Sequence, residues 1–589
     1  MEERTTWDLT YFYKDRDGFL QDLAKVKGVG DELASFAGKL SDEDKLAEFL
    51  RLDKAANVLI ARLYFYASMG SDLNKKDVTK SEDLAKVQVA LEELGSKTSF
   101  EAPELLSLGE ERIMAFLDAH KDLQEYRFSM KKLFRGKDHV LSADKEKLLS
   151  AYSPLLSEAR QLYSMLTVAD REMAKARLSD GEVEVTMSNW SSLIKKAKTA
   201  EDRQAIFTAL YKYYDERKNA YAEIYNLGLK GQLATMRGRG YKSILDTHLY
   251  DDAIPEKVFS SLIEVASTHT QPLHEYYDLR AKALGLKKHR SYDRFLPLAE
   301  SEASYTYEQA KQTFFDSIKE FPADFQAKAH EVLKPGFVDV YPADGKRTGA
   351  YSNGGYDFHP YILLNFNGEL NDVFTLAHES GHSMHTLYAE EHQPTLLQDY
   401  TIFVAEIAST FNEHNLVDYL LKSDSLTKQD KIFLLQKEID EIVSTFYRQT
   451  LFAHFERDIA KMAEEGQPIN YVVLSKKMTE LYALYYGIDI EEEGLKPLVW
   501  AYIPHLFYTP FYVYQYATSF TSSMLIYKRV KEKVPGAFDS YIRLLSSGGN
   551  DYPVEQVKRA GVDLTTKEPF LAVVERMEEL VRKLKALLN

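Results

Sequence analysis

The sequence predicts a mainly helical protein that carries a small β-sheet. Apolar residues recur at helical spacing along most of the 589 residues, whereas strand-like alternation occurs in only a few short stretches. No fixed-period repeat is present, so a solenoid is not expected. Helices are expected near residues 41–68, 81–94, 146–178, 200–236, 255–285, 305–333, 427–464 and 565–588.

The helix near residue 81 illustrates the pattern on which these predictions rest. Leu84, Val87 and Leu91 follow the spacing of one helix face. Ser81 precedes two acidic residues and is expected to cap the helix, because its hydroxyl can accept a hydrogen bond from a free N–H group. Gly95 is expected to end the helix.

Two short strand pairs interrupt the helical pattern. The Asp-Gly pair at 180–181 precedes alternating residues at 182–186, which predicts a small hairpin. Farther along the chain, the Asn-Gly-Gly run at 353–355 is expected to form a turn, and residues 361–366 are expected to form a strand. The next helix should begin near Leu370.

A modest change in composition near residues 190–203 predicts a domain boundary. We expect an N-terminal helical domain over residues 1–200. The larger region, residues 201–589, is expected to be the catalytic domain, because it contains the motifs described below.

The overall charge and the absence of cysteine exclude several classes of function. A net charge of −16, without a strong basic cluster, argues against a nucleic-acid partner. With no cysteine, the chain can form neither disulfides nor cysteine-ligated metal sites. The first residues lack the basic start and apolar run of a secretory signal, so a cytoplasmic location is expected.

One long uncharged stretch, residues 497–527, has the length of a membrane span. It contains His505, Gln515, two prolines and many tyrosines and threonines, and such residues are costly to insert into lipid. We therefore expect a buried segment or the wall of a cleft, and no membrane partner.

The strongest chemical signal is a His-Glu-x-x-His motif formed by His378, Glu379 and His382. On a helix, residues four apart lie on one face, so both imidazoles can bind one zinc ion. Glu379 is then placed to take a proton from the attacking water. Gly381 lowers helix propensity and is interpreted as allowing another backbone to approach closely. The alternative is a pair of surface histidines on an amphipathic helix.

A catalytic zinc ion needs a third protein ligand. The longer motif with a third histidine fails, because that position holds Tyr388. Glu406, from a following helix, is the other option. Glu413 lies two helical turns further on the same face, where it would either hydrogen-bond a liganding histidine or face solvent. His385 is interpreted as a supporting donor or a packed histidine, not as a ligand.

Residues 377–385, together with Glu406 in the segment 403–406, resemble the thimet-type oligopeptidase family and, within it, the oligoendopeptidase F group. Residues 6–10, 349–351 and 511–517 are also similar to that group. The resemblance covers most of the chain and is weakest in the N-terminal third. Ser380 stands where other branches of the family have phenylalanine. This difference does not affect the metal ligands and says nothing about substrate specificity.

This resemblance implies a mainly helical fold whose two halves enclose a deep substrate channel. It implies cleavage of short, unstructured peptides. It also implies that His378, His382 and Glu406 hold one zinc ion and that Glu379 is the catalytic acid, which agrees with the analysis of the motif itself.

The charge-free stretch offers donors for the negative oxygen that forms during peptide hydrolysis. The resemblance implies that a histidine and tyrosines of this region contact the substrate, and His505 matches well. We favour Tyr508 and Tyr512 as the tyrosines, although core packing explains at least half of the tyrosines there. A sheet edge at residues 361–367 is expected to pair with an extended peptide.

Two other functions remain open at this point. A metallocarboxypeptidase with a similar motif would remove single residues from C-termini. A catalytically inactive relative would only bind peptides, although the intact Glu379 argues against it. The oligomeric state does not follow from the sequence.

Overall fold

The structure is a computed structural model that describes residues 4–589, and for nine residues between 143 and 157 it describes only the backbone. The opening residues Met1–Glu3, on which the predicted location partly rests, lie outside the described residues. Helices make up 69% of the protein, and the described residues form two small sheets. The predicted mainly helical fold is therefore confirmed.

The chain divides into two compact units, each assembled from three separate segments. Unit 1 comprises Met1–Asp138, Ala303–Lys422 and Ile526–Gly561, and unit 2 comprises His139–Glu302, Ser423–Leu525 and Val562–Asn589. The domain boundary predicted near residue 200 lies inside unit 2. The division into an N-terminal helical domain and a catalytic domain stays a prediction.

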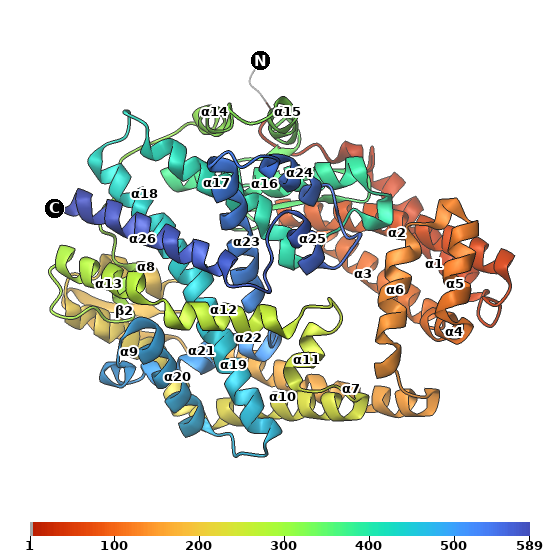
Figure 1. The fold of residues 1–589 in the computed structure, drawn as a ribbon, viewed down its shortest axis with the longest axis horizontal. Coiled ribbons are helices and arrows are strands. Elements are labelled where there is room, and N and C mark those ends of the chain that lie inside the picture. Colours follow the sequence, from red (N-terminus) through yellow and green to blue (C-terminus); the bar gives the residue numbers. More distant parts are fainter. Residues whose placement is uncertain (1–3) are drawn as a thin grey trace. The chain divides into compact units, whose positions relative to one another are not determined.

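Unit 1 contains the small three-stranded sheet and the two helices that bear the metal-binding motif (Figure 1). Its strands are β3 (Val338–Asp339), β4 (Tyr351–Gly355) and β5 (Phe358–Leu363). Its helices are α1 (Arg16–Ala34), α2 (Glu43–Leu73), α3 (Val78–Thr98), α4 (Glu101–Leu108), α5 (Glu110–Ala119), α6 (Tyr126–Arg135), α14 (Tyr307–Ser317), α15 (Ala323–Val332), α16 (Leu370–His392), α17 (Ile402–Leu421), α24 (Ala537–Leu545) and α25 (Pro553–Arg559).

Unit 2 is helical apart from one hairpin, formed by β1 (Ala174–Leu178) and β2 (Gly181–Val185) as predicted. Helix α23 (Tyr514–Lys531) begins in unit 2 and ends in unit 1. The other helices of unit 2 are α7 (Ala143–Ser164), α8 (Trp190–Lys196), α9 (Ala200–Glu216), α10 (Lys218–Arg239), α11 (Ile244–Leu249), α12 (Glu256–Thr268), α13 (Gln271–Ala283), α18 (Lys428–Glu441), α19 (Arg448–Glu464), α20 (Tyr471–Tyr486), α21 (Val499–Tyr502), α22 (His505–Tyr508) and α26 (Glu568–Leu588).

Some of the predicted helix ends are wrong for local reasons. Helix α3 starts earlier than expected, because the side chain of Asp77 accepts hydrogen bonds from the N–H groups of Thr79 and Lys80. The helix passes through Gly95, whose backbone is helical, and ends at Thr98. The long pattern predicted at 146–178 ends in a π-helical turn, after which the chain enters β1.

The sheet of unit 1 has the order β3-β5-β4, so β5 is its central strand. β5 pairs in parallel with β3 and antiparallel with β4. The turn between β4 and β5 lies at Tyr356 and Asp357, whose φ angles of 57° and 66° fit a two-residue hairpin turn. The Asn-Gly-Gly run at 353–355, predicted to be this turn, instead belongs to β4. Glycine is needed there because the strands approach closely, and a Cβ on Gly354 would lie 2.6 Å from Cα of Pro360.

The charge-free stretch at 497–527 is largely buried, as predicted. Trp500, Tyr514 and Phe520 are fully buried within unit 2. None of the described helices combines the length and the apolar character that crossing a bilayer requires.

The link between α22 and α23 depends on a buried acid. Phe511 has a φ of 56°, a left-handed conformation that is unfavourable for a side chain of this size. Its N–H group donates a 2.7 Å hydrogen bond to Glu456 of α19, which is 2% exposed. Burial raises the pKa of Glu456 to about 8, although the hydrogen bond from Phe511 lowers it. The carboxyl group is therefore mostly protonated near neutral pH.

Replacing Glu456 with glutamine should change how stability depends on pH. In the wild type, the folded protein keeps a proton that the unfolded chain releases near pH 4.5, so stability should fall as pH rises from that value to about 8. Glu456→Gln should flatten this part of the curve of melting temperature against pH. Glu92→Gln, on the exposed face of α3, is the control and should leave the slope unchanged. Equal slopes in wild type and Glu456→Gln would contradict the assignment.

Candidate metal centre

Helix α16 carries the His-Glu-x-x-His motif and begins at Leu370, as predicted. Its first turn is closed by a capping box, in which the side chains of Glu369 and Asp372 each accept a hydrogen bond from the other residue's N–H group. The buried face includes Phe374, Ala377 and Met384. These contacts fix the rotation of the helix, and the motif histidines lie on its partly exposed side.

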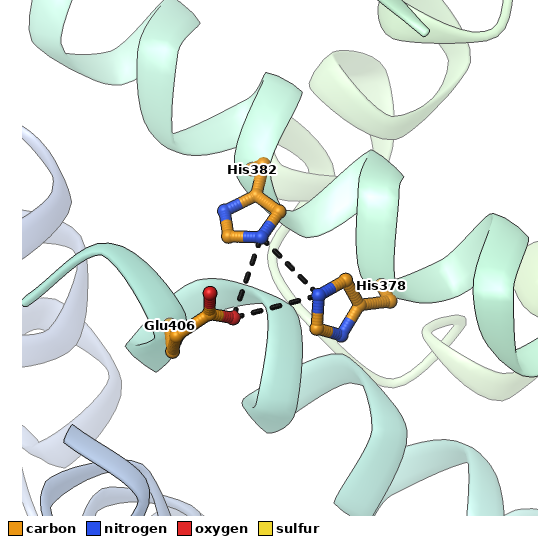
Figure 2. Close-up of side chains that lie close together, drawn as sticks. All are labelled: His378, His382 and Glu406. Atoms are coloured by element: carbon orange, nitrogen blue, oxygen red, sulfur yellow. Dashed lines mark hydrogen bonds and ion pairs between the residues drawn. The ribbon is translucent and has the colours of Figure 1, made fainter. Parts of the chain in front are cut away.

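His378, His382 and Glu406 converge on one point in unit 1 (Figure 2). The Nε2 atoms of the two histidines are 3.2 Å apart. Each Nε2 lies 3.4 Å from Oε2 of Glu406. Ligand atoms at about 2.05 Å from a tetrahedral zinc ion are separated from one another by about 3.4 Å. The three side chains therefore fit a single metal ion of this kind.

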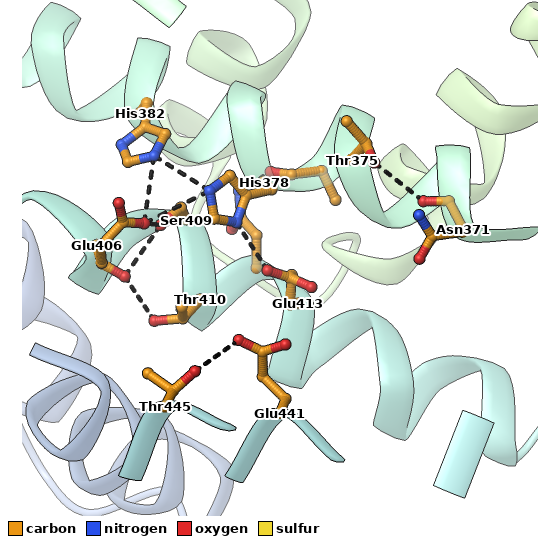
Figure 3. Close-up of polar contacts among 12 residues, drawn as sticks. Asn371, Thr375, His378, His382, Glu406, Ser409, Thr410, Glu413, Glu441 and Thr445 are labelled. Carbon is orange, nitrogen blue, oxygen red and sulfur yellow. Dashed lines mark hydrogen bonds and ion pairs between the residues drawn. The ribbon is translucent and has the colours of Figure 1, made fainter. Parts of the chain in front are cut away.

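Helix α17 supplies two carboxylates to this site from one face (Figure 3). Glu413 Oε1 lies 2.7 Å from Nδ1 of His378, which fixes the ring and leaves Nε2 for a metal. Glu406 is itself held by the hydroxyl of Ser409, which donates a 2.8 Å hydrogen bond to its Oε2 atom. Of the two alternatives left open by the sequence, the structure supports the contact between Glu413 and a histidine.

The electrostatics of the site favour a bound cation. Burial lowers the pKa of His378, but the hydrogen bond and charge of Glu413, with Glu379 and Glu406, raise it to about 9 overall. Burial raises the pKa of Glu406, but its contacts with His382 and the charge of His378 bring it down to about 2. Burial is the main cause of the raised pKa of Glu379, which is 6% exposed.

The candidate metal ligands open onto a cleft of 590 Å³ within unit 1. Its other wall is β4, which is an edge strand of the sheet. The hydroxyls of Ser352 and Ser383, 2.7 Å apart, tie β4 to α16. The cleft is lined by residues 350–355, His378, Glu379, His382, Thr386, residues 398–400, Ile402, Ala405 and Glu406.

The sequence placed the peptide-pairing edge on the wrong strand. Residues 361–363 belong to β5, which is hydrogen-bonded on both sides and has no free edge. The edge beside the metal-binding residues is β4 instead. The sequence missed it because its residues include two adjacent glycines, which resemble a turn more than a strand.

His385 is a packed histidine, one of the two roles expected from the sequence. It is 1% exposed, and its ring stacks on Tyr400 at a centroid distance of 3.6 Å. Burial lowers the pKa of His385 to about 3. Tyr400 also lines the cleft, although no sequence motif indicated it.

The other predicted site residues lie in unit 2. The rings of His505, Tyr512 and Tyr516 form one group, with centroid distances of 6.5 Å between His505 and Tyr512 and 5.4 Å between Tyr512 and Tyr516. Tyr508 is in contact with Tyr163 of α7 instead. Burial lowers the pKa of His505.

Gly381 allows α16 and α17 to touch. A Cβ at this position would lie 2.6 Å from both the carbonyl oxygen of Ala408 and the Cα of Ser409. Asn412 of α17 also donates a 3.0 Å hydrogen bond to the carbonyl oxygen of Ala377. The neighbouring backbone expected at Gly381 is thus that of α17.

Helix α16 presents two histidines and an intervening glutamate, and the next helix completes the group with a carboxylate. This arrangement defines the protein as a metal-dependent hydrolase. Comparisons with known proteins point to the same class. The profile of Peptidase family M3 matches residues 193–576, and that of Oligopeptidase F matches residues 104–172. Because the first match covers more than half of the chain, the protein belongs to peptidase family M3 and is a metallo-oligopeptidase.

Individual relatives are similar over nearly the whole chain. Group B oligopeptidase PepB of Streptococcus agalactiae is 33% identical, over 98% of this chain and 97% of its own. Oligopeptidase PepF of Bacillus subtilis is also 33% identical, over 99% and 87%. The solved structure of oligoendopeptidase-F from Enterococcus faecium matches with a TM-score of 0.75 at 25% identity, covering 97% of this chain and 99% of that one.

Replacing Gly381 with alanine should loosen the metal centre. The added methyl group would push α16 from α17 and so separate the histidines from Glu406. We expect metal affinity to fall by on the order of 10- to 100-fold, as when other supporting contacts of a metal site are lost. Zinc titration with a competing chelator measures this.

Gly95→Ala is the matched control, because it also changes a helical glycine but places the methyl group in open space. This variant should keep wild-type metal affinity and gain about 0.5–1 kcal/mol of stability. Unchanged metal affinity in Gly381→Ala would show that the close helix contact does not position the ligands.

Proposed function

We propose that the protein is a zinc-dependent endopeptidase that cleaves internal bonds of short, unstructured peptides. The observation that carries this proposal is the group of three ligand atoms, 3.2–3.4 Å apart, on the wall of a cleft. Two nitrogens and one carboxylate oxygen are a donor set that zinc prefers in catalytic sites. The names of the relatives, which include oligoendopeptidases, support the same activity.

Each side chain of the centre has a distinct role in this proposal. His378, His382 and Glu406 would hold one zinc ion, which supplies Lewis acidity toward the peptide carbonyl and toward water. Glu379 is buried beside the histidines, and burial raises its pKa, so it can accept a proton from the attacking water. Glu379 then delivers that proton to the nitrogen of the leaving amine. Glu413 keeps His378 in the required orientation.

The edge strand β4 supports main-chain recognition of the substrate. An extended peptide can pair with such an edge through backbone hydrogen bonds, which makes few demands on its side chains. No lysine or arginine is among the described residues that line the cleft. A carboxypeptidase needs a cation for the terminal carboxylate of its substrate, so this lining favours the endopeptidase over the metallocarboxypeptidase alternative.

His505 and Tyr512 remain our proposed donors to the negatively charged oxygen. The contact between their rings supports a shared function, and the lowered pKa of His505 favours a neutral imidazole that can donate one N–H group. Tyr508 remains a candidate, with less support because it packs against Tyr163. We further propose a cytoplasmic location, in line with the absence of cysteine.

Variants of the two acidic residues should separate metal binding from catalysis. Glu379→Gln should retain zinc and lose at least about 1000-fold in kcat, because it removes the proton acceptor but no ligand. Glu406→Ala should lose zinc affinity together with activity. Metal content by elemental analysis and initial rates on a quenched peptide measure both effects, with Glu92→Gln as the surface control. Normal turnover by Glu379→Gln would refute the proposed mechanism.

The mode of cleavage can be tested with a peptide blocked at both ends. An endopeptidase should cut it internally, and a chelator should abolish the cut until zinc is returned. Mass spectrometry of the products identifies the bond. If only the unblocked peptide were shortened, one residue at a time from its C-terminus, the carboxypeptidase alternative would be correct. Metal-replete protein that binds the peptide without cutting it would indicate the inactive relative.

A further inference from the structure

One acid in the cleft beside the candidate metal ligands has no role in the proposed mechanism. Besides Glu379 and Glu406, Asp399 is the only carboxylate among the described residues that line this cleft. It lies in the segment between α16 and α17 and is exposed. Its Oδ1 atom accepts a 2.9 Å hydrogen bond from the N–H group of Tyr400, but it forms no ion pair with any residue that the structure describes. The carboxylate is therefore available to a ligand in the cleft.

The loop that carries Asp399 is held by two other segments of unit 1. Gln398 is 3% exposed, and its side-chain oxygen accepts a 2.8 Å hydrogen bond from the N–H group of Asp357. Its amide nitrogen also donates a 2.6 Å hydrogen bond to the carboxylate of Asp357. The N–H group of Gly549 donates a 2.8 Å hydrogen bond to the carbonyl oxygen of Leu397. A Cβ on Gly549 would lie 2.5 Å from the carbonyl oxygen of Asp399, so these segments fix the backbone that carries the acid.

The next residue, Tyr400, ties the same loop to the helix that carries the motif. Its ring stacks on His385 of α16 at a centroid distance of 3.6 Å. Its hydroxyl group donates a 3.4 Å hydrogen bond to the carbonyl oxygen of His382 and lies 3.2 Å from the hydroxyl oxygen of Thr386. Because Tyr400 is anchored in this way, Asp399 is held next to α16.

The edge strand β4 indicates where along a bound peptide this acid would act. Asp357, which holds the loop of Asp399, follows two residues after Gly355, the last residue of β4. Nearer the start of β4, Ser352 is hydrogen-bonded to the residue that follows His382. Three residues separate Ser352 from Gly355, which is about 10 Å of extended chain. A peptide paired along β4 would therefore bring a residue about two to four positions from the cleaved bond toward Asp399.

We propose that Asp399 selects peptides that carry a positively charged nitrogen group near the cleaved bond, either a lysine or arginine side chain or a free amino terminus. This inference rests on the proposed endopeptidase function. No lysine or arginine is among the described residues that line the cleft, so none competes for the carboxylate there. Burial by the surrounding walls raises the pKa of Asp399, and a bound cation would stabilise its charged form. Asp399 would thus determine specificity and take no part in the chemical step.

The first experiment compares two peptides that differ in a single charge. Both are quenched fluorescent peptides blocked at both ends, and one has arginine where the other has citrulline, its neutral analogue. The zinc-loaded wild type should favour the arginine peptide by roughly 10-fold in kcat/KM, because a charge-assisted hydrogen bond forms only with arginine. Asp399→Asn should abolish this preference. The same preference in both proteins would overturn the proposal for the side chain.

A third peptide tests the other source of the charge. It has citrulline and a free amino terminus in place of the block. If the free amino terminus raises kcat/KM in the wild type and not in Asp399→Asn, the group that Asp399 binds is the terminal ammonium. If neither arginine nor the free amino terminus gives an advantage that depends on Asp399, the proposal is overturned.

Charge reversal and a matched control separate recognition from a structural role. Asp399→Lys should favour a peptide with glutamate over the same peptide with glutamine. Asp539→Asn removes an exposed acid of unit 1 that does not line the cleft, and it should keep the wild-type preference for arginine. An arginine moved along the peptide should lose its advantage more than a few residues from the cleaved bond. Equal losses of activity toward the arginine and citrulline peptides in Asp399→Asn would show a structural role and overturn the proposal.

Peptide binding without turnover distinguishes a failure of this inference from a failure of the proposed function. Zinc-loaded Glu379→Gln should bind the labelled arginine peptide roughly 10-fold more tightly than the citrulline peptide in fluorescence anisotropy, and adding Asp399→Asn should remove the difference. If the wild type cut no peptide while this difference persisted, the endopeptidase function would fail and recognition by Asp399 would stand. If the wild type cut both peptides equally well, the endopeptidase function would stand and the role of Asp399 would be refuted.

Discussion

The close contact between α16 and α17 is the constraint on which the metal centre depends. At Gly381 the backbones meet so tightly that a single methyl group would collide with Ala408 and Ser409. The hydrogen bond from Asn412 to the carbonyl oxygen of Ala377 holds the same pair of helices on their buried side. Two imidazoles from one helix can share a metal ion with a carboxylate from the other only at this separation.

The geometry of α17 explains why both of its acids are useful. Glu406 and Glu413 are two turns apart and face α16 together, one toward Nε2 and the other toward Nδ1 of His378. Glu406 completes the group of candidate ligand atoms. Glu413 contacts Nδ1 of His378 and so leaves Nε2 available for a metal ion. A single helix face therefore provides both a candidate metal ligand and the support of another candidate ligand.

The metal centre in unit 1 holds an excess of negative charge. In unit 1, acidic residues surround the histidines and raise the pKa of His378 to about 9, which is the environment that a cation stabilises. This excess of one sign of charge is informative because burial makes it costly.

The sequence by itself determined the helical class, the hairpin at residues 180–181 and the choice of candidate metal ligands. These follow from short-range rules, since the spacing of His378 and His382 is fixed by the period of a helix. Glu406 could be proposed from sequence because it is a carboxylate on the helix that follows the motif, and the family resemblance implies the same ligand. Tertiary structure alone decided that Glu413 contacts His378 and that β4, not residues 361–367, forms the sheet edge. Those contacts join residues far apart in the chain, where local spacing carries no information, and they depend on how helices and strands pack.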